Sequence, residues 1–166
     1  MLSLLLIELL EAVSYAHQEN IIHRDLKPEN ILMGSDGRPR IIDFGVSKIL
    51  GTLRSGHTVG DLFTRPYASP EQVDQQLVSP ASDIYSLAAV FYFMLTRNDP
   101  ASSLGLSDQF KTLTEIPVGI LRIAQRMAAI KPSDRYDTAH QIILDLQLAQ
   151  RQLQSRNQKF YLQLSR

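Results

Sequence analysis

The sequence predicts a mainly α-helical domain that carries one small β-hairpin. Apolar residues from Leu2 to Ala16 recur at the spacing of a half-buried helix. Residues 84–95 are apolar at every position but one, which predicts a helix buried on all sides. Two short apolar runs flank an Asp36-Gly37 pair, a typical hairpin turn. With 166 residues, 44% of them hydrophobic, the chain can build one core.

The composition excludes several classes of function. Seventeen Lys and Arg residues balance seventeen Asp and Glu residues, and no long run of one sign occurs, so we expect no nucleic-acid surface. The chain has no cysteine, which excludes disulfides, thiolate metal sites and cysteine nucleophiles. A cysteine-free composition is typical of a cytoplasmic protein, and we expect that location.

The first ten residues are hydrophobic enough to suggest a signal peptide. No basic residue precedes Leu2, however, and Glu8 and Glu11 interrupt the apolar stretch before any cleavage site. The pattern instead predicts a core helix that ends at about Gln18. The longest apolar run, residues 84–95, is too short to span a bilayer.

The next segment predicts short strands and a long loop. Residues 21–22 are expected to form a very short strand, and residues 31–33 and 41–42 the two strands of the hairpin. Residues 45–66 are rich in Gly, Ser and Thr and show no periodicity. A loop of that length in a compact domain is usually functional, and we expect it to be regulatory.

The second half of the chain is predicted to be helical. Pro117 opens a second amphipathic pattern. Thr138 and Gln141 have the spacing of a capping box ahead of a further apolar series, and we expect one there. From Gln147 onward the chain is rich in Gln and Arg with scattered Leu, which predicts an extension of the last helix that frays toward Arg166.

Two motifs carry the chemistry. Residues 23–30 read His-Arg-Asp-Leu-Lys-Pro-Glu-Asn, and Asp43-Phe44-Gly45 follows the hairpin. The chain resembles the protein kinase family, whose catalytic loop is H-R-D-L-x-x-x-N and whose metal-binding motif is D-F-G. Ser69-Pro70-Glu71 resembles the family's A-P-E motif. The motifs occur in the family's order, which makes the match far more specific than an isolated Asp-Phe-Gly.

The resemblance implies a fold and a domain division. We expect a kinase-like large lobe, mainly α-helical, with its small hairpin at the catalytic cleft. Residues 1–148 would be the C-terminal lobe, a partial catalytic domain, and residues 149–166 a helical extension or tail. Asp83 stands where the family has an Asp at its central helix. Arg135 is expected to form a buried ion pair with Glu71.

By the same resemblance, six residues are assigned to the site. Asp25 would accept the substrate hydroxyl proton, and Lys27 would bring its ammonium to the transferring phosphate of ATP. Asn30 and Asp43 would hold Mg²⁺ through oxygen ligands. Leu32 would lie beneath the adenine ring. The sixth residue, Thr64, would form hydrogen bonds near the catalytic Asp and Lys.

The substrate class also follows from the resemblance. Lys27 and Thr64 are typical of the serine/threonine branch, so the partner is expected to be a protein with Ser or Thr acceptors. The phrases over 67–72 and 81–87 resemble bacterial members. Phosphorylation of the 45–66 loop, with pairing to Arg24, is a further hypothesis. His23 is expected to be structural rather than catalytic.

One large part of the family pattern has no counterpart. Nothing before His23 can supply the Gly-rich loop and strand Lys of the β-rich N-terminal lobe. Three alternatives stay open: a fragment or split product of an active signalling kinase, a noncatalytic binding module, and a small-molecule phosphotransferase. The first is favoured, with a separate N-terminal lobe as a possible partner, and the chain is expected to be inactive alone.

Overall fold

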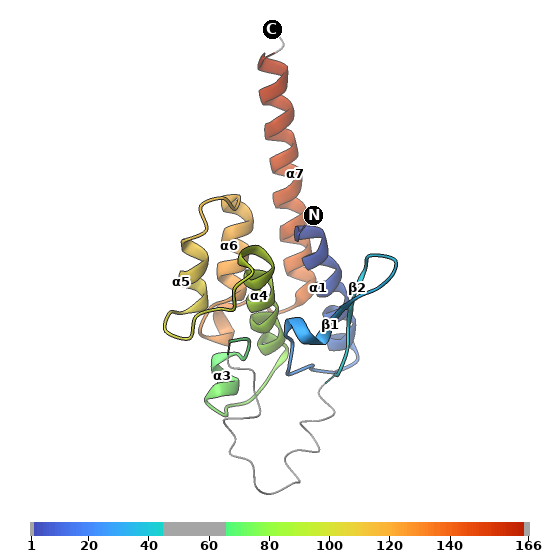
Figure 1. The fold of residues 1–166 in the computed structure, drawn as a ribbon, viewed down its shortest axis with the longest axis vertical. Helices are drawn as coiled ribbons and strands as arrows, with labels where there is room; N and C mark the ends of the chain where they lie inside the picture. The colour runs from blue at the N-terminus through green and yellow to red at the C-terminus, as the bar shows by residue number, and fades with distance from the viewer. Residues whose placement is uncertain (1, 45–65, 165–166) are drawn as a thin grey trace, which may run out of the picture.

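Helices make up most of the structure, and one small sheet lies beside them (Figure 1). The computed structural model describes residues 2–44 and 66–164. Within these ranges the elements, in chain order, are α1 (Leu2–Gln18), η1 (Pro28–Asn30), β1 (Ile31–Met33), β2 (Pro39–Ile41), α3 (Pro70–Val73), α4 (Pro80–Thr96), α5 (Leu106–Lys111), α6 (Val118–Met127), η3 (Pro132–Asp134) and α7 (Ala139–Leu164). The predicted fold class, mainly α-helical with a hairpin, is confirmed.

Helix α1 ends at Gln18, as its pattern predicts. It packs against α7, and α4 and β2 flank it on different sides (Figure 1). Because it is covered from two directions, its buried stripe is wider than predicted and includes Ile7 and Leu10. Leu2, which the pattern also assigns to that stripe, is only half-buried.

Helix α4 is the centre of the core. Every residue from Ser82 to Phe91 is buried except Tyr85. Ser79 caps its first turn in a reciprocal arrangement with Ser82, and proline occupies the first helical position. The predicted all-apolar central helix is therefore confirmed, and it begins four residues before the apolar run.

The hairpin is present with a shifted second strand. Ile31 pairs with Ile41 and Met33 with Pro39, so β2 covers 39–41 and not 41–42. The turn needs Gly37, whose φ of +76° is a left-handed conformation that favours glycine. The turn closes where the Gly34 N–H donates to the Arg38 carbonyl at 2.8 Å.

Other local predictions need correction. Residues 21–22 form no strand. The short elements α3, α5, η1 and η3 carry too few residues for a periodic signal, and the sequence pattern missed them. At the start of α7 the Gln141 N–H donates to Thr138 Oγ1 at 3.3 Å, but Gln141 Oε1 accepts from the Asp137 N–H, one residue earlier than a capping box requires.

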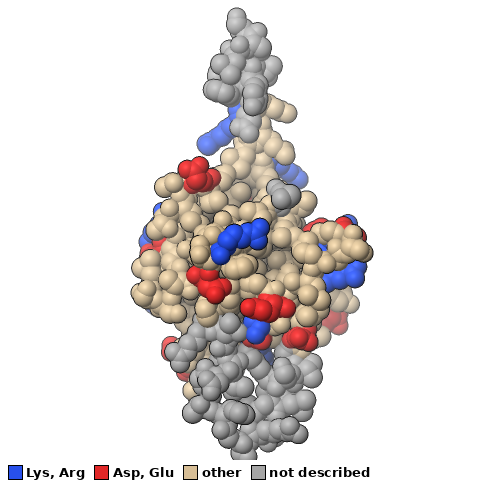
Figure 2. Space-filling model, in the orientation of Figure 1, with Lys and Arg blue, Asp and Glu red and all other residues tan. Residues whose placement is uncertain are grey.

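Helix α7 extends well beyond the rest of the molecule (Figure 1). It runs without a break through residues 148 and 149, so the division at that point stays a prediction. On the face shown in Figure 2, basic and acidic side chains are scattered among neutral ones. No helix within the described ranges is both long and apolar enough to cross a membrane.

Candidate catalytic site

Asp25, Lys27 and Asn30 lie together in the loop between α1 and β1. Lys27 Nζ is 3.5 Å from Asp25 Oδ2. Asn30 Nδ2 donates to the Asp25 carbonyl at 2.7 Å and approaches Asp25 Oδ2 at 3.4 Å. Asn30 is 7% exposed, whereas Asp25 and Lys27 stay half-buried and open to solvent. Three of the predicted site residues therefore share one compact arrangement.

The loop is held in place by the buried carboxylate of Asp83. Its Oδ2 accepts the His23 N–H at 2.9 Å, and its Oδ1 accepts the Arg24 N–H at 2.9 Å. His17 Nε2, at the end of α1, lies 2.8 Å from the same Oδ2. Since Asp83 is 1% exposed on the central helix, it anchors the loop to the buried core of the fold.

Arg24 has a strained backbone that these contacts stabilise. Its φ is +69°, a left-handed conformation that costs a non-glycine residue about 1–3 kcal/mol. Its N–H is bound by Asp83, and its carbonyl accepts a hydrogen bond of 2.7 Å from Gln72 Nε2. The left-handed conformation of Arg24 turns the chain just before Asp25. The hydrogen bonds to Arg24 hold this turn, and with it the backbone from which the Asp25 side chain projects.

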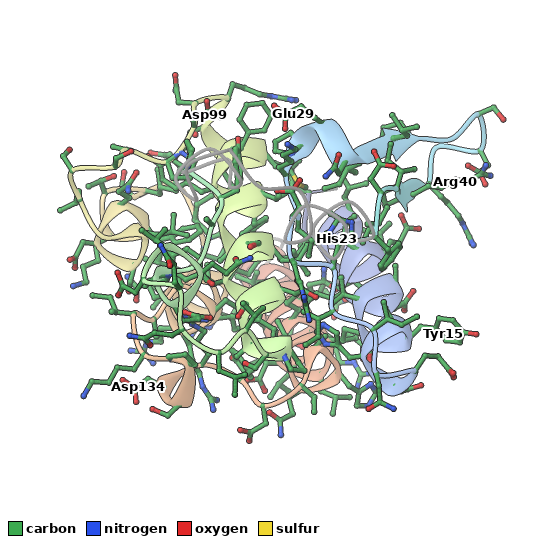
Figure 3. All side chains as sticks on the ribbon, turned by 90° about the horizontal axis from the view of Figure 1, so that it is seen from below. Tyr15, His23, Glu29, Arg40, Asp99 and Asp134 are labelled. Carbon is green, nitrogen blue, oxygen red and sulfur yellow. The ribbon has the colours of Figure 1, made fainter. Side chains whose placement is uncertain are left out.

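His23 connects the loop to the segment after β2. The Asp25 N–H donates to His23 Nδ1 at 3.2 Å, so Nε2 carries the proton and donates to the Ile42 carbonyl at 2.9 Å. The His23 ring also packs on Phe44, with centroids 4.7 Å apart. His23 is 1% exposed and lies at the interior (Figure 3), as expected of a structural histidine.

Asp43 is positioned by the hydrogen bonds that join the neighbouring Ile42 to the catalytic loop. The Ile42 N–H donates to the Asn30 carbonyl at 2.9 Å, so Asp43 follows directly after a residue bonded to the catalytic loop. Its φ of +58° is again left-handed, and its side chain is exposed. The structure thus brings Asp43 to the Asn30 side of the loop, although 13 positions separate them in the sequence.

The donor set suits a cation held by few protein ligands. Among residues 2–44 and 66–164, no three His, Cys, Asp or Glu side chains gather as a metal site. Asn30 donates to Asp25 through its amide nitrogen, so its amide oxygen is the atom that would bind a cation. One amide and one carboxylate oxygen fit Mg²⁺, which keeps several waters and is commonly completed by substrate phosphates.

The remaining predicted residues differ in their surroundings. Leu32 is 52% exposed on β1, next to Met33, which is 56% exposed. Thr64 lies outside the described residues, as do Gly45 and the rest of the 45–65 segment.

The predicted Glu71–Arg135 ion pair is confirmed. Arg135 Nη1 is 2.7 Å from Glu71 Oε1, and both side chains are almost fully buried. Burial alone would raise the pKa of Glu71, but hydrogen bonds from Arg135 and Ser82 outweigh it and lower that pKa to about 2. The pair fixes α3, which contains Glu71, to the helical core.

Tyr67 provides a second connection. Its buried hydroxyl donates to the Asp99 carboxylate in the loop after α4. Burial and the hydrogen bond to Asp99 raise the pKa of Tyr67 above its ordinary value. His17, Tyr67 and Gln72 were not singled out from the sequence, because their roles depend on partners between 32 and 66 positions away.

The fold is a helical core that carries an acidic loop, the arrangement expected of a kinase-like large lobe. Residues 2–157 match the family profile described as "Protein kinase domain". The chain belongs to the protein kinase family.

Curated relatives agree with this assignment. The chain is 33% identical over 154 residues to the Serine/threonine-protein kinase PrkC of Bacillus subtilis, a match that covers 86% of this chain and 24% of PrkC. It is 31% identical to the Serine/threonine-protein kinase PknB of Mycolicibacterium smegmatis, covering 82% of this chain and 24% of PknB. The chain spans about a quarter of the length of these relatives.

A solved structure shows the same fold. The kinase domain of Mycobacterium tuberculosis PknI aligns with a TM-score of 0.65 at 23% identity, over 89% of this chain and 54% of that one. The match is to the C-terminal portion of a kinase domain, and it confirms the predicted kinase-like large lobe.

Proposed function

We propose that the protein is the catalytic lobe of a serine/threonine protein kinase that transfers the γ-phosphate of ATP to Ser or Thr hydroxyls of a protein. The observation that carries the proposal is a pair of contacts made by Asp25. Asn30 Nδ2 donates to the Asp25 carbonyl at 2.7 Å, and Lys27 Nζ lies 3.5 Å from the Asp25 carboxylate. A carboxylate base, a cationic ammonium group and the Asn30 amide are thereby held close together within one loop. Such positioning is the main requirement of phosphoryl transfer.

Each residue has a defined role in the proposed reaction. Asp25 orients the substrate hydroxyl and accepts its proton as the oxygen attacks the γ-phosphorus and the bond to the bridging oxygen of ADP breaks. Lys27 stabilises charge on the transferring phosphoryl group. Its contact with Asp25 keeps both groups on the same side of the loop.

Asn30 and Asp43 are the residues that would hold Mg²⁺. The metal supplies charge neutralisation of the nucleotide phosphates when bound. Leu32 is proposed to contact the adenine, and its 52% exposure leaves an apolar surface for that contact. Thr64 is proposed to act near Asp25, as its position in the sequence motif implies.

Activity is proposed to require an N-terminal lobe from elsewhere in the protein or from a partner. The chain covers 54% of the PknI kinase domain and has no Gly-rich loop before the catalytic loop. The uncovered side chains of Leu32 and Met33 support such a contact. We also propose a cytoplasmic location, which the cysteine-free composition supports.

The decisive experiment joins the chain to the N-terminal lobe of a related kinase and follows ³²P transfer from MgATP to a Ser/Thr protein substrate. Asp25→Asn keeps the shape but removes the base, so turnover should fall by about 10²–10⁴-fold. The control is Asp137→Asn, an exposed carboxylate outside the loop, which should leave turnover unchanged. Equal turnover of the Asp25→Asn and unsubstituted enzymes would overturn the proposal, and chelation of Mg²⁺ should abolish transfer.

A further inference from the structure

The side chain of Gln72 connects α3 to the candidate catalytic loop. It is 2% exposed, and both ends of its amide make hydrogen bonds. Nε2 donates to the Arg24 carbonyl at 2.7 Å, across 48 positions of the sequence. Oε1 accepts from the Ser69 N–H and from Ser69 Oγ, each at 3.1 Å. One buried amide therefore holds the residue that comes directly before Asp25.

We propose that Gln72 is a positioning residue for Asp25, because it fixes the peptide group from which the Asp25 carboxylate projects. The inference rests on the proposed kinase function, in which Asp25 accepts the proton of the substrate hydroxyl. In this role Gln72 acts through the backbone of the loop and touches no reacting atom. It lies in α3, directly after the Ser69-Pro70-Glu71 motif.

The peptide group between Arg24 and Asp25 is held at both of its ends. A peptide unit is planar, so the Arg24 carbonyl and the Asp25 N–H belong to one plane and point in opposite directions. Gln72 binds the carbonyl, while the Asp25 N–H donates to His23 Nδ1 at 3.2 Å. Hydrogen bonds on opposite sides oppose rotation of the plane. The direction in which the Asp25 side chain leaves the backbone is fixed with it.

The conformation of Arg24 makes this support necessary. Its φ of +69° is left-handed, and a residue other than glycine keeps such a conformation only where its surroundings hold it. Asp83 Oδ1 accepts the Arg24 N–H at 2.9 Å and so holds the peptide group before Arg24. Gln72 holds the one after it. Removing the Gln72 donor would release the second peptide group while Asp83 keeps the first in place.

The two ends of the Gln72 amide have defined partners. A backbone N–H can only donate, so the amide atom that lies 3.1 Å from the Ser69 nitrogen must be the oxygen. The amide nitrogen then faces the Arg24 carbonyl, which can only accept. An amide fits this position because it offers an acceptor at one end and a donor at the other. A carboxylate offers acceptors alone.

Gln72 reaches the loop from a backbone that the core fixes. The neighbouring Glu71 is bound by Arg135 through two hydrogen bonds of 2.7 and 2.8 Å, and Ser69 is fully buried. These contacts hold α3 independently of the catalytic loop. Gln72 thereby transmits the position of α3 to the peptide group beside Asp25, and the Glu71–Arg135 pair supports the loop through it.

Two substitutions separate the hydrogen bond from packing. Gln72→Glu keeps the shape and the oxygen that Ser69 uses, but it replaces the donor to Arg24 by a second acceptor. Gln72→Met keeps most of the volume and removes the polar atoms. The matched control is Gln76→Glu, the same change at an exposed position just after α3. Circular dichroism checks that each variant is folded.

Kinetics use the chain joined to the N-terminal lobe of a related kinase. At pH 8 both Gln72 variants should lower kcat at least about tenfold, since a displacement of about 1 Å can already cost roughly a hundredfold. KM for MgATP should stay within about twofold of the parent, because Gln72 contacts none of the residues proposed to hold the nucleotide. Gln76→Glu should leave both constants unchanged. A parent-like kcat in Gln72→Glu would overturn the inference.

The pH profile gives a readout that a packing role would not move. Burial raises the pKa of a carboxyl, so the group introduced by Gln72→Glu should take up a proton as the pH is lowered from 8 to 6. Its O–H can then donate to the Arg24 carbonyl. Relative to the parent at each pH, kcat of Gln72→Glu should recover at least about threefold, whereas Gln72→Met should not recover. Parallel profiles of the two variants would contradict the positioning role, and if Gln72→Met is unfolded, absence of recovery in Gln72→Glu decides alone.

Amide hydrogen exchange tests the contact in the chain as it is, without any activity. In Gln72→Glu at pH 8 the Asp25 N–H should exchange at least about tenfold faster than in the parent. The amide of Leu87, in the core of α4, should be unchanged. Unchanged exchange at Asp25, or equal acceleration at Leu87, would show that Gln72 does not position the loop locally.

Failure of this inference can be distinguished from failure of the kinase assignment. Phosphotransfer that is lost in Asp25→Asn but is parent-like in the Gln72 variants would remove the positioning role and leave the kinase function. If no joined enzyme transfers phosphate, the kinase function fails, and the positioning role, which rests on it, fails with it. Faster exchange at Asp25 would then record a contact of the fold without a catalytic purpose.

Discussion

Arg135 and Glu71 are joined by two parallel hydrogen bonds, Nη1 to Oε1 at 2.7 Å and Nη2 to Oε2 at 2.8 Å, although 64 positions separate them. The other Arg135 N–H groups donate to the carbonyls of Ala129, Ala81 and Ile130 at 2.8, 2.8 and 2.9 Å. All five donors of the guanidinium are therefore used. The arginine joins α3, the start of α4 and the loop after α6 through one buried hydrogen-bond network.

Removing either partner should destabilise the fold. Glu71→Gln leaves the guanidinium without its counter-charge, and the free energy of unfolding should fall by about 3–5 kcal/mol. Arg135→Met should cost at least as much, because it also leaves three carbonyls without their donor. Urea unfolding followed by circular dichroism measures both. A loss below about 1 kcal/mol for either variant would show that the pair does not hold the segment.

The lowered pKa of Glu71 predicts how stability depends on pH. The ordinary value is 4.5 and the folded value about 2, so the folded state binds this proton less readily than the unfolded state. The stabilisation is complete above about pH 4.5 and is lost as the pH falls toward about 2. The urea concentration at the midpoint of unfolding, measured between pH 2 and 6, should decrease as the pH is lowered through that window. Glu71→Gln should show a smaller fall, and an identical pH profile would contradict the assignment.

Asp83→Asn should loosen the catalytic loop. The carboxylate accepts the backbone N–H groups of His23 and Arg24, and a neutral amide has only one oxygen to replace two. We expect a loss of roughly 1.5–3 kcal/mol, with faster amide hydrogen exchange at His23 and Arg24. Asp134→Asn is the control, since Asp134 is an exposed carboxylate in the η3 turn (Figure 3). Unchanged exchange in the Asp83 variant would contradict the anchoring role.

Tyr67→Phe should weaken the connection between the 66–69 segment and the loop after α4. It removes the hydroxyl that binds Asp99 while keeping the buried ring. A hydrogen bond to a charged group contributes about 1.5–3 kcal/mol, so thermal unfolding should shift downward accordingly. Asp99→Asn should have a smaller effect, because the amide oxygen can still accept. If the Tyr67 and Asp99 losses simply add in the double variant, the two groups are not coupled.

The chain by itself should bind MgATP weakly or not at all. Leu32 is 52% exposed on β1, so one face of an adenine resting there would stay in water and most of its burial would be lost. Displacement of the phosphates by about 1 Å already lowers the rate roughly a hundredfold. Isothermal titration should give no micromolar affinity. Micromolar binding together with phosphotransfer would show that the chain needs no second lobe.

Much of this architecture follows from local patterns in the sequence. The spacing from Leu2 to Ala16 predicts α1 and its end, and the apolar run from Ile84 to Leu95 predicts the central helix. The motif residues Asp25 and Asn30 are close in sequence, so their common site needed no long-range information. Such features depend on neighbouring residues and on periodic burial, which a single sequence records.

Tertiary contacts decided the rest. Helix α3 has four residues and no periodicity, and it exists where Glu71 meets Arg135 and Gln72 meets Arg24. Asp83 could be assigned to a helix, but only the fold shows that its carboxylate holds the catalytic loop. Each buried polar group needs its own partner, and partners distant along the chain leave no local pattern that sequence alone could reveal.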